Sequence, residues 1–128
     1  MLSQMNVTEK VSQIGSCYYY ELQTNGQLDM DKANGRLKNG IGQITRLGGA
    51  STLTPVELAK TANLLQQSLV EKTHLGIPAI IHDECCSGAL SLGGSIFPQM
   101  IGLAGTFQPD LAEKMTAEIR QQLRAVGI

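Results

Sequence analysis

Apolar side chains recur at helical spacing in two long stretches of this chain. The first opens with Thr54–Glu57, which supplies an N-cap, a proline at the first helical position and a capping-box glutamate; it predicts a helix closed by Gly76. The second starts at Pro109 and stops at Gly127. The apolar stripes lie at Leu58, Ala62, Leu65 and Leu69 in the first helix, and at Leu111, Met115, Ile119, Leu123 and Val126 in the second.

A short apolar run, Ala79–Ile81, follows the first helix and ends abruptly at His82–Glu84. Such a brief continuous run after a helix end predicts a strand buried on both faces, as in parallel α/β sheets. Upstream, Gly40–Arg46 is β-branched in places and bracketed by glycines, which predicts another strand with Arg46 at its carboxyl end. Strand, helix and strand in this order predict an α/β fold containing a βαβ unit with a parallel pair.

The N-terminal third of the chain carries weaker signals. Asn6–Glu9 fits an N-cap with a capping-box glutamate and predicts a short helix that ends at Gly15. Cys17–Asn39 contains several Asn-Gly pairs and is interpreted as an ordered loop with a helical turn near Asp31–Leu37. Its three consecutive tyrosines, Tyr18–Tyr20, fit either ring stacking on a ligand or, more commonly for aromatics, a ring buried in the core.

Composition limits the function classes. The chain has 128 residues, 42% hydrophobic and 16% charged, which suits one domain with a true core. Ten basic and eleven acidic residues leave a net charge of -1, and no basic stripe is present, so we expect no nucleic-acid partner. No apolar span is long enough for a membrane helix, and no signal peptide is visible; a cytoplasmic location is expected if Met1 is the authentic N-terminus.

Several common catalytic and cofactor motifs are missing from the sequence. It contains no GxGxxG, no Walker-type phosphate loop and no GxSxG, so neither a nucleotide nor another cofactor is expected. Cys17, Cys85 and Cys86 lack CxxC spacing, and an odd count with an adjacent pair predicts reduced thiols rather than a disulfide framework. With only His74 and His82 as further soft ligands, no metal site is expected.

The best candidate site is the polar cluster at the two predicted strand ends. Carboxylates at such ends lie where α/β barrels place their active sites. Strand alternation predicts that His82 and Glu84 share one side while Asp83 points to the other. A carboxylate there can accept two hydroxyl protons, as proteins do to hold sugars, or it can simply tie down a loop. Arg46 fits either a ligand contact or a salt bridge that fixes its loop.

Several strings in the chain, in unbroken order, resemble glycoside hydrolase family 3. The opening LSQMNVTEKVSQI is similar to the "MTLEEKVGQ" string usual in that family. The resemblance continues through GIGQITRLGG, LGIPAIIHDECCSG, IFPQMIGLAGTFQPDLAEKM and IRQQLRAVGI, and so covers essentially the whole chain.

The resemblance implies a (β/α)₈ barrel followed by an α/β sandwich, and retaining, exo-acting hydrolysis of β-linked sugars. It implies that residues 1–128 are the N-terminal portion of the barrel domain, incomplete as a TIM-like barrel, which needs roughly 250 residues. In members of that family, the acidic residue at the position of Glu84 binds hydroxyls of the sugar in the innermost subsite, so the resemblance implies this role for Glu84. Arg46 matches the end of an early strand in β-glucosidase-like members and is a weaker match.

The chain departs from the family in one capping residue and in lacking the two catalytic carboxylates. Gln108 stands where an aspartate usually precedes the proline, so the last helix lacks its best N-cap. The family's nucleophilic aspartate and its acid/base lie beyond this chain, so no catalytic residue is expected within it and the chain alone is expected to be inactive. An alternative is a non-catalytic half-barrel that binds sugars or self-associates through an uncovered sheet.

Overall fold

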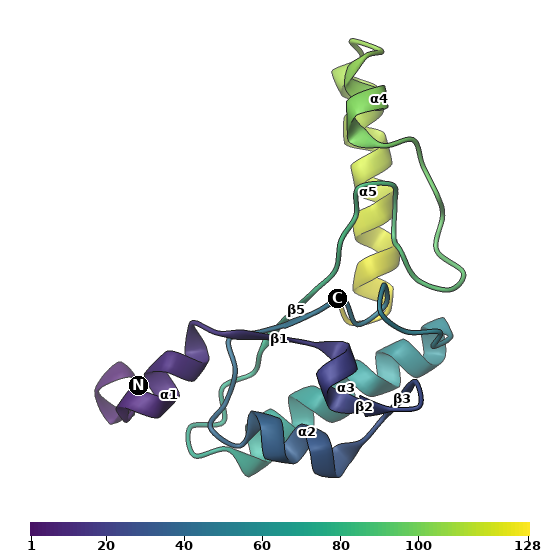
Figure 1. Ribbon diagram of the computed structural model, residues 1–128. Helices are drawn as coiled ribbons and strands as arrows, with labels where there is room; N and C mark the ends of the chain where they lie inside the picture. Colours follow the sequence, from purple (N-terminus) through teal and green to yellow (C-terminus); the bar gives the residue numbers. More distant parts are fainter.

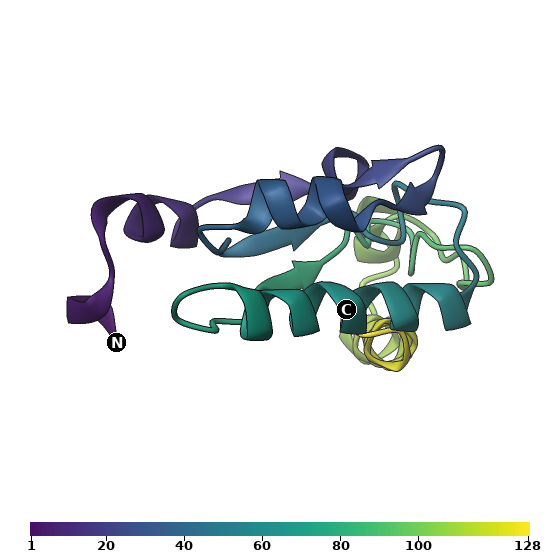
Figure 2. The ribbon, with the colours of Figure 1, turned by 90° about the horizontal axis from the view of Figure 1, so that it is seen from below.

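The computed structural model describes all 128 residues, which form an α/β chain with one parallel sheet (Figures 1 and 2). The strands are β1 (Ser16–Tyr18), β2 (Gln23–Thr24), β3 (Gln27–Leu28), β4 (Gln43–Thr45) and β5 (Ile80–His82). The helices are η1 (Leu2–Gln4), α1 (Val7–Gln13), η2 (Tyr19–Leu22), α2 (Met30–Leu37), α3 (Pro55–Lys72), α4 (Met100–Ala104) and α5 (Pro109–Ala125), where η denotes a 3₁₀-helix.

The main sheet has the strand order β1-β4-β5, and both pairs are parallel. Ile44 pairs with Cys17 on one side and Ile81 on the other. Helix α3 connects β4 to β5, so the predicted βαβ unit is confirmed. Consecutive strands that lie side by side, each joined through a helix, are the arrangement expected for the first part of a (β/α)₈ barrel.

Strand β1 was not expected, because two of its three residues, Cys17 and Tyr18, lie in the stretch interpreted as a loop. Cys17 and Tyr18 pair with β4, and the chain then forms η2 and a two-stranded hairpin, β2 with β3. Asn25 and Gly26 make the tight turn of this hairpin with φ of 53° and 84°, which suits Asn-Gly. A three-residue strand is too short to show a period, so only its pairing with β4 identifies it.

The sheet is covered on one face only. The central residue of each strand (Cys17, Ile44 and Ile81) is buried in the main core, which includes the apolar stripe of α3. Ile80 points to the opposite face and is 66% exposed, so the prediction of a strand buried on both faces is wrong. Figure 1 shows the reason: α2 and α3 lie on one side of the strands, and no helix lies along the opposite side, from which α4 and α5 project.

Helix α3 confirms the strongest sequence prediction. The Thr54 side chain caps Glu57 N–H, and the Glu57 carboxylate accepts from Thr54 N–H at 2.7 Å. Its predicted stripe is buried in the core. The helix ends at Lys72, earlier than predicted, because the backbone is already extended at Thr73; Gly76 has φ of 60° in the turn that follows. None of the helices is both long and apolar enough to cross a membrane.

Helices α4 and α5 stand away from the rest of the molecule (Figure 1). Met115 and Ile119 of α5 form a small separate cluster with Leu103 of α4, whereas Val126, at the other end of α5, joins the main core. Leu111, predicted for the same stripe, is 44% exposed. The short helix α1 has its predicted capping box, but its apolar residues, among them Val11, stay exposed.

A better N-cap is expected to stabilise α5. Gln108 makes no side-chain capping hydrogen bond, and Pro109 follows at the first helical position. A Gln108→Asp variant supplies an acceptor for the free N–H groups of the first turn and should raise the free energy of unfolding by about 1 kcal/mol. Urea denaturation followed by circular dichroism measures this. Gln108→Ala is the control, and equal stability of the two variants would contradict the expectation.

Candidate functional site

The polar residues singled out in the sequence lie together at one edge of the sheet. Thr45 pairs with His82, the last residues of β4 and β5, and Arg46 N–H donates to the His82 carbonyl at 2.9 Å. Arg46 and Glu84 therefore follow the ends of neighbouring parallel strands. This is the carboxyl edge, where barrel enzymes carry their sites.

Asp83 ties the two strand ends together. One carboxylate oxygen, Oδ2, accepts from the N–H groups of Gly48 and Gly49, each at 2.8 Å. The other, Oδ1, accepts from Glu84 N–H at 2.9 Å. The loop-tying role that the sequence left open for a rim carboxylate thus belongs to Asp83. In the sequence, the adjacent glycines Gly48 and Gly49 signal a loop whose N–H groups are open to a carboxylate, but they do not tell which acidic residue binds them.

Glu84 is exposed and forms no ion pair. Its only side-chain contact of hydrogen-bond type is a weak one, in which the Cys86 thiol donates to Oε2 at 3.5 Å. The loop that follows turns back at Gly88, whose φ is 110°; a methyl group there would lie 2.1 Å from the Ser95 carbonyl oxygen. Only glycine fits that position, so it fixes the path of the chain beyond Glu84.

Arg46 is half-buried and its guanidinium forms neither an ion pair nor a hydrogen bond. The salt bridge considered as one interpretation of Arg46 is therefore not formed. Its φ of 60° lies in the left-handed region, which a non-glycine residue adopts only at a cost of about 1 kcal/mol or more. The ion pairs of the chain are Arg36 with Glu21 and His74 with Glu9.

His82 and Tyr18 also lie at this edge, where each pairs with Thr45, and Tyr19 and Tyr20 follow Tyr18 directly. The His82 ring is half-buried, and its Nε2 is buried without a hydrogen-bond partner. Tyr19 is fully buried, which confirms that one of the three rings fills the core. Tyr18 and Tyr20 are exposed and stack on each other, with ring centroids 5.2 Å apart.

The family follows from a comparison with known proteins. Residues 6–128 match the domain described as the glycosyl hydrolase family 3 N terminal domain. That range includes every element from α1 to α5 and both strand ends of the candidate site.

The chain belongs to glycosyl hydrolase family 3.

Curated relatives in glycosyl hydrolase family 3 agree with this match. The chain is 30% identical over its whole length to a putative beta-xylosidase of Formosa agariphila, covering 17% of that protein. It is 39% identical, over 66% of its length, to a periplasmic beta-glucosidase/beta-xylosidase of Dickeya chrysanthemi, covering 14% of it. It is 28% identical over its whole length to beta-glucosidase C of Emericella nidulans, covering 22% of it. The chain thus spans less than a quarter of each relative.

The thiols of this family 3 chain are free. Cys17 is buried, and burial raises its pKa to about 11. Cys85 is half-buried, and burial, followed by the nearby Asp83 carboxylate, raises its pKa as well. No group of three histidine, cysteine, aspartate or glutamate side chains is placed to hold a metal ion.

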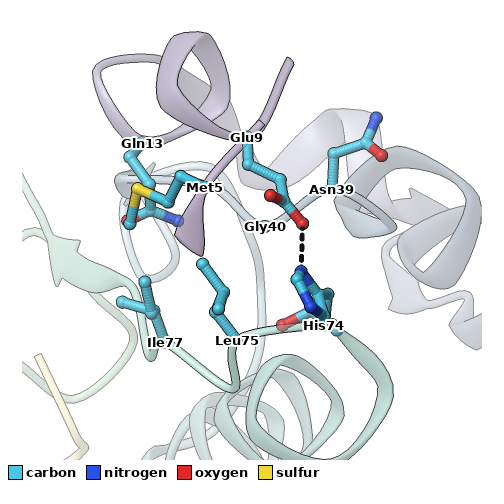
Figure 3. Close-up of a pocket in the computed structure, with 9 residues that line it drawn as sticks. Met5, Glu9, Gln13, Asn39, Gly40, His74, Leu75 and Ile77 are labelled. Carbon is cyan, nitrogen blue, oxygen red and sulfur yellow. Dashed lines mark hydrogen bonds and ion pairs between the residues drawn. The ribbon is translucent and has the colours of Figure 1, made fainter. Parts of the chain in front are cut away.

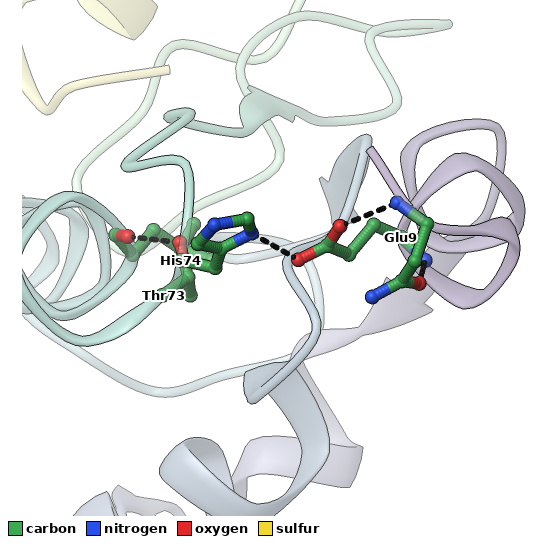
Figure 4. Close-up of polar contacts among 5 residues, drawn as sticks. Glu9, Thr73 and His74 are labelled. Atoms are coloured by element: carbon green, nitrogen blue, oxygen red, sulfur yellow. Dashed lines mark hydrogen bonds and ion pairs between the residues drawn. The ribbon is translucent and has the colours of Figure 1, made fainter. Parts of the chain in front are cut away.

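A small pocket lies between α1 and the turn after α3, away from the strand ends (Figure 3). It offers about 10 Å³, room for roughly one water molecule. At its wall the Glu9 carboxylate accepts from Asn6 N–H at 2.8 Å and contacts His74 Nδ1 at 2.9 Å (Figure 4). No local pattern in the sequence reveals this contact, because 65 positions separate the two partners. The Glu9–His74 contact fastens α1 to the turn. The pocket itself is too small for a sugar.

The Glu9 contact is expected to make stability depend on pH. The Asn6 N–H, and after it His74, lower the pKa of Glu9 below its usual value. A lowered carboxyl pKa stabilises the fold above the unfolded-state value of about 4.5 and loses that effect as pH falls through the folded-state value. Glu9→Gln should therefore lower the melting temperature at pH 7 and make little difference near pH 3. Thermal scans of this variant and of the exposed control Glu118→Gln test this, and a deficit independent of pH would contradict it.

Proposed function

We propose that this chain forms the first part of the barrel of a retaining, exo-acting β-glycosidase and contributes to its innermost sugar subsite. In this proposal Glu84 accepts hydrogen bonds from sugar hydroxyls, and Arg46 is a secondary contact. The observation that carries it is the pair of unpaired, oppositely charged groups that follow neighbouring strand ends at the carboxyl edge.

The chemistry of these two groups suits a sugar. A carboxylate accepts two hydroxyl protons at once, and a guanidinium donates to oxygen acceptors, so together they match the alternating donors and acceptors of a pyranose rim. The relatives are named beta-xylosidase, beta-glucosidase or both. The proposed substrates are therefore β-glucosides or β-xylosides.

Catalysis itself is assigned to residues outside these 128. Retaining hydrolysis needs a nucleophile and an acid/base whose carboxyl groups lie about 5–5.5 Å apart across the sugar bond. Asp83 is a poor partner for Glu84 in that role, because its two oxygens already accept from three N–H groups. We therefore expect the isolated chain to bind a sugar weakly and to hydrolyse nothing.

Two measurements on the 128-residue chain test the proposal. Incubation with 4-nitrophenyl β-glucoside and β-xyloside should release no nitrophenol beyond a buffer blank. Titration with methyl β-glucoside or methyl β-xyloside should shift the backbone NMR signals of Arg46 and Glu84, with methyl α-glucoside as the control sugar. Turnover would contradict the placement of the catalytic pair, and the absence of any shift would contradict the sugar subsite.

A second candidate is a non-catalytic half-barrel that self-associates. The observation that favours it is the open face of the sheet, where Ile80 is 66% exposed, together with exposed apolar residues on α1 such as Val7 and Val11. Open strand edges and apolar faces promote pairing between copies. Size-exclusion chromatography at several concentrations distinguishes the two: a dimer or larger species favours self-association, and a monomer that melts cooperatively argues against it.

A further inference from the structure

We propose that Asp83 is a positioning residue, whose carboxylate clamps the segment after β4 to the end of β5 and so sets where Arg46 and Glu84 lie. The inference deepens the proposed function and rests on it, because it concerns the residues assigned to the sugar. Asp83 itself does not touch the sugar in this proposal.

Three backbone donors converge on the Asp83 carboxylate. The N–H groups of Gly48 and Gly49, two and three residues after Arg46, both donate to Oδ2 at 2.8 Å. The N–H of Glu84 donates to Oδ1 at 2.9 Å. One side chain thus holds the backbone beside each of the two proposed ligand residues. Hydrogen bonds to an ionised acceptor are among the stronger ones in proteins, which suits a clamp.

The glycines allow this close approach. A methyl group on Gly48 would lie 3.0 Å from Asp83 Oδ2 and 2.9 Å from the Ser91 Cβ. A methyl group on Gly49 would lie 2.8 Å from Asp83 Oδ1 and 3.4 Å from Arg46 Nη2. Carboxylate and guanidinium therefore approach the same small spot on the backbone, and a side chain at Gly49 would push against the Asp83 carboxylate.

Arg46 stays unpaired beside the clamp. Asp83 is a carboxylate close to the guanidinium, yet its oxygens accept from the three N–H groups, and no Asp83–Arg46 ion pair forms. The backbone of Arg46 is held in the left-handed region with its N–H on the His82 carbonyl, which fixes the origin of its side chain. The position of the guanidinium is thereby restricted, while its N–H groups stay free to donate to the proposed sugar.

Asp83→Asn is the first test. Three donors surround the two oxygens, so the amide NH₂ of asparagine must face at least one N–H group and lose that hydrogen bond. We expect amide exchange at Gly48 and Gly49, or at Glu84, to accelerate about tenfold or more. We expect the affinity for methyl β-glucoside to fall by a similar factor of about ten. Asp110→Asn, at an exposed aspartate without a hydrogen bond, is the matched control and should change neither quantity.

Gly49→Ala is the second variant and leaves Asp83 intact. The added methyl group would lie 2.8 Å from Asp83 Oδ1 and displace the carboxylate, so it should weaken sugar binding as Asp83→Asn does. Circular dichroism and thermal melting show whether each variant is folded. If both variants fold and keep the sugar affinity of the unaltered chain, the proposal is overturned, even where amide exchange has accelerated, because the clamp would then be structural only.

A third readout separates this proposal from the proposed function. The rate at which phenylglyoxal modifies Arg46, read by peptide mapping, reports its placement without any sugar. If the unaltered chain binds no sugar, the proposed function fails. The clamp is then supported if Asp83→Asn changes that rate by about threefold or more relative to Asp110→Asn, and overturned if it does not.

Discussion

Replacing Glu84 with glutamine is expected to weaken the binding of methyl β-glucoside to this chain by roughly 10- to 100-fold. The exposed Glu84 carboxylate makes no ion pair, so its loss should leave the fold undisturbed while the proposed charged acceptor for sugar hydroxyls disappears. Hydrogen bonds to a charged group contribute about 1.5–3 kcal/mol each, and 1.4 kcal/mol is a factor of ten in affinity. NMR titration measures the change in dissociation constant.

Two further variants make the Glu84 result specific. Glu113→Gln removes an equally exposed carboxylate on α5 and should leave affinity unchanged. Arg46→Met removes the proposed secondary contact and should have a smaller effect than Glu84→Gln. The assignment of Glu84 is contradicted if Glu84→Gln and Glu113→Gln bind the sugar equally well.

Replacing Tyr19 with alanine is expected to lower the free energy of unfolding by about 3–5 kcal/mol. The ring is fully buried in the main core, beside the sheet and the apolar stripe of α3. Domains of this size are stable by roughly 5–15 kcal/mol, so the variant should be partly unfolded at room temperature or melt far earlier. Chemical denaturation followed by circular dichroism gives the magnitude.

Two neighbouring substitutions isolate the cause of the Tyr19 effect. The Tyr19 hydroxyl is buried without a partner, and burial raises its pKa, so Tyr19→Phe should keep or increase stability, by up to about 1 kcal/mol. Tyr20→Ala removes an exposed ring that only stacks on Tyr18, and should cost about 0.5–1.5 kcal/mol. A Tyr19→Ala variant as stable as Tyr20→Ala would show that this ring does not hold the core.

Local signals predicted the elements with strong termini. The capping boxes at Asn6 and Thr54 and the apolar stripe of α3 depend on neighbouring residues, and all three were confirmed. Strand β1 was missed because its partner, β4, lies more than 20 positions away along the chain. A three-residue strand is defined by its partner, and no local pattern within it reveals the pairing.

The sequence predicted where the candidate site lies on the sheet, but not the hydrogen bonds within it. Sequence position put Arg46 and the acidic pair after neighbouring strands, and the register of Thr45 with His82 confirms that the two ends are adjacent. Which acidic residue ties the loop was not predictable. The Gly48–Gly49 segment meets Asp83 only after the chain has passed through the whole of α3.

The sequence by itself determined the helix starts that N-caps mark, the parallel βαβ unit and the membership of glycosyl hydrolase family 3, because these depend on residue order and spacing. The tertiary structure alone decided that Ile80 is exposed, that Tyr19 rather than its neighbours fills the core, and that Asp83 binds the loop while Glu84 stays free. Those outcomes depend on which surfaces meet. Burial and hydrogen-bond partners are properties of contacts between distant segments, and such contacts exist only once the chain has folded.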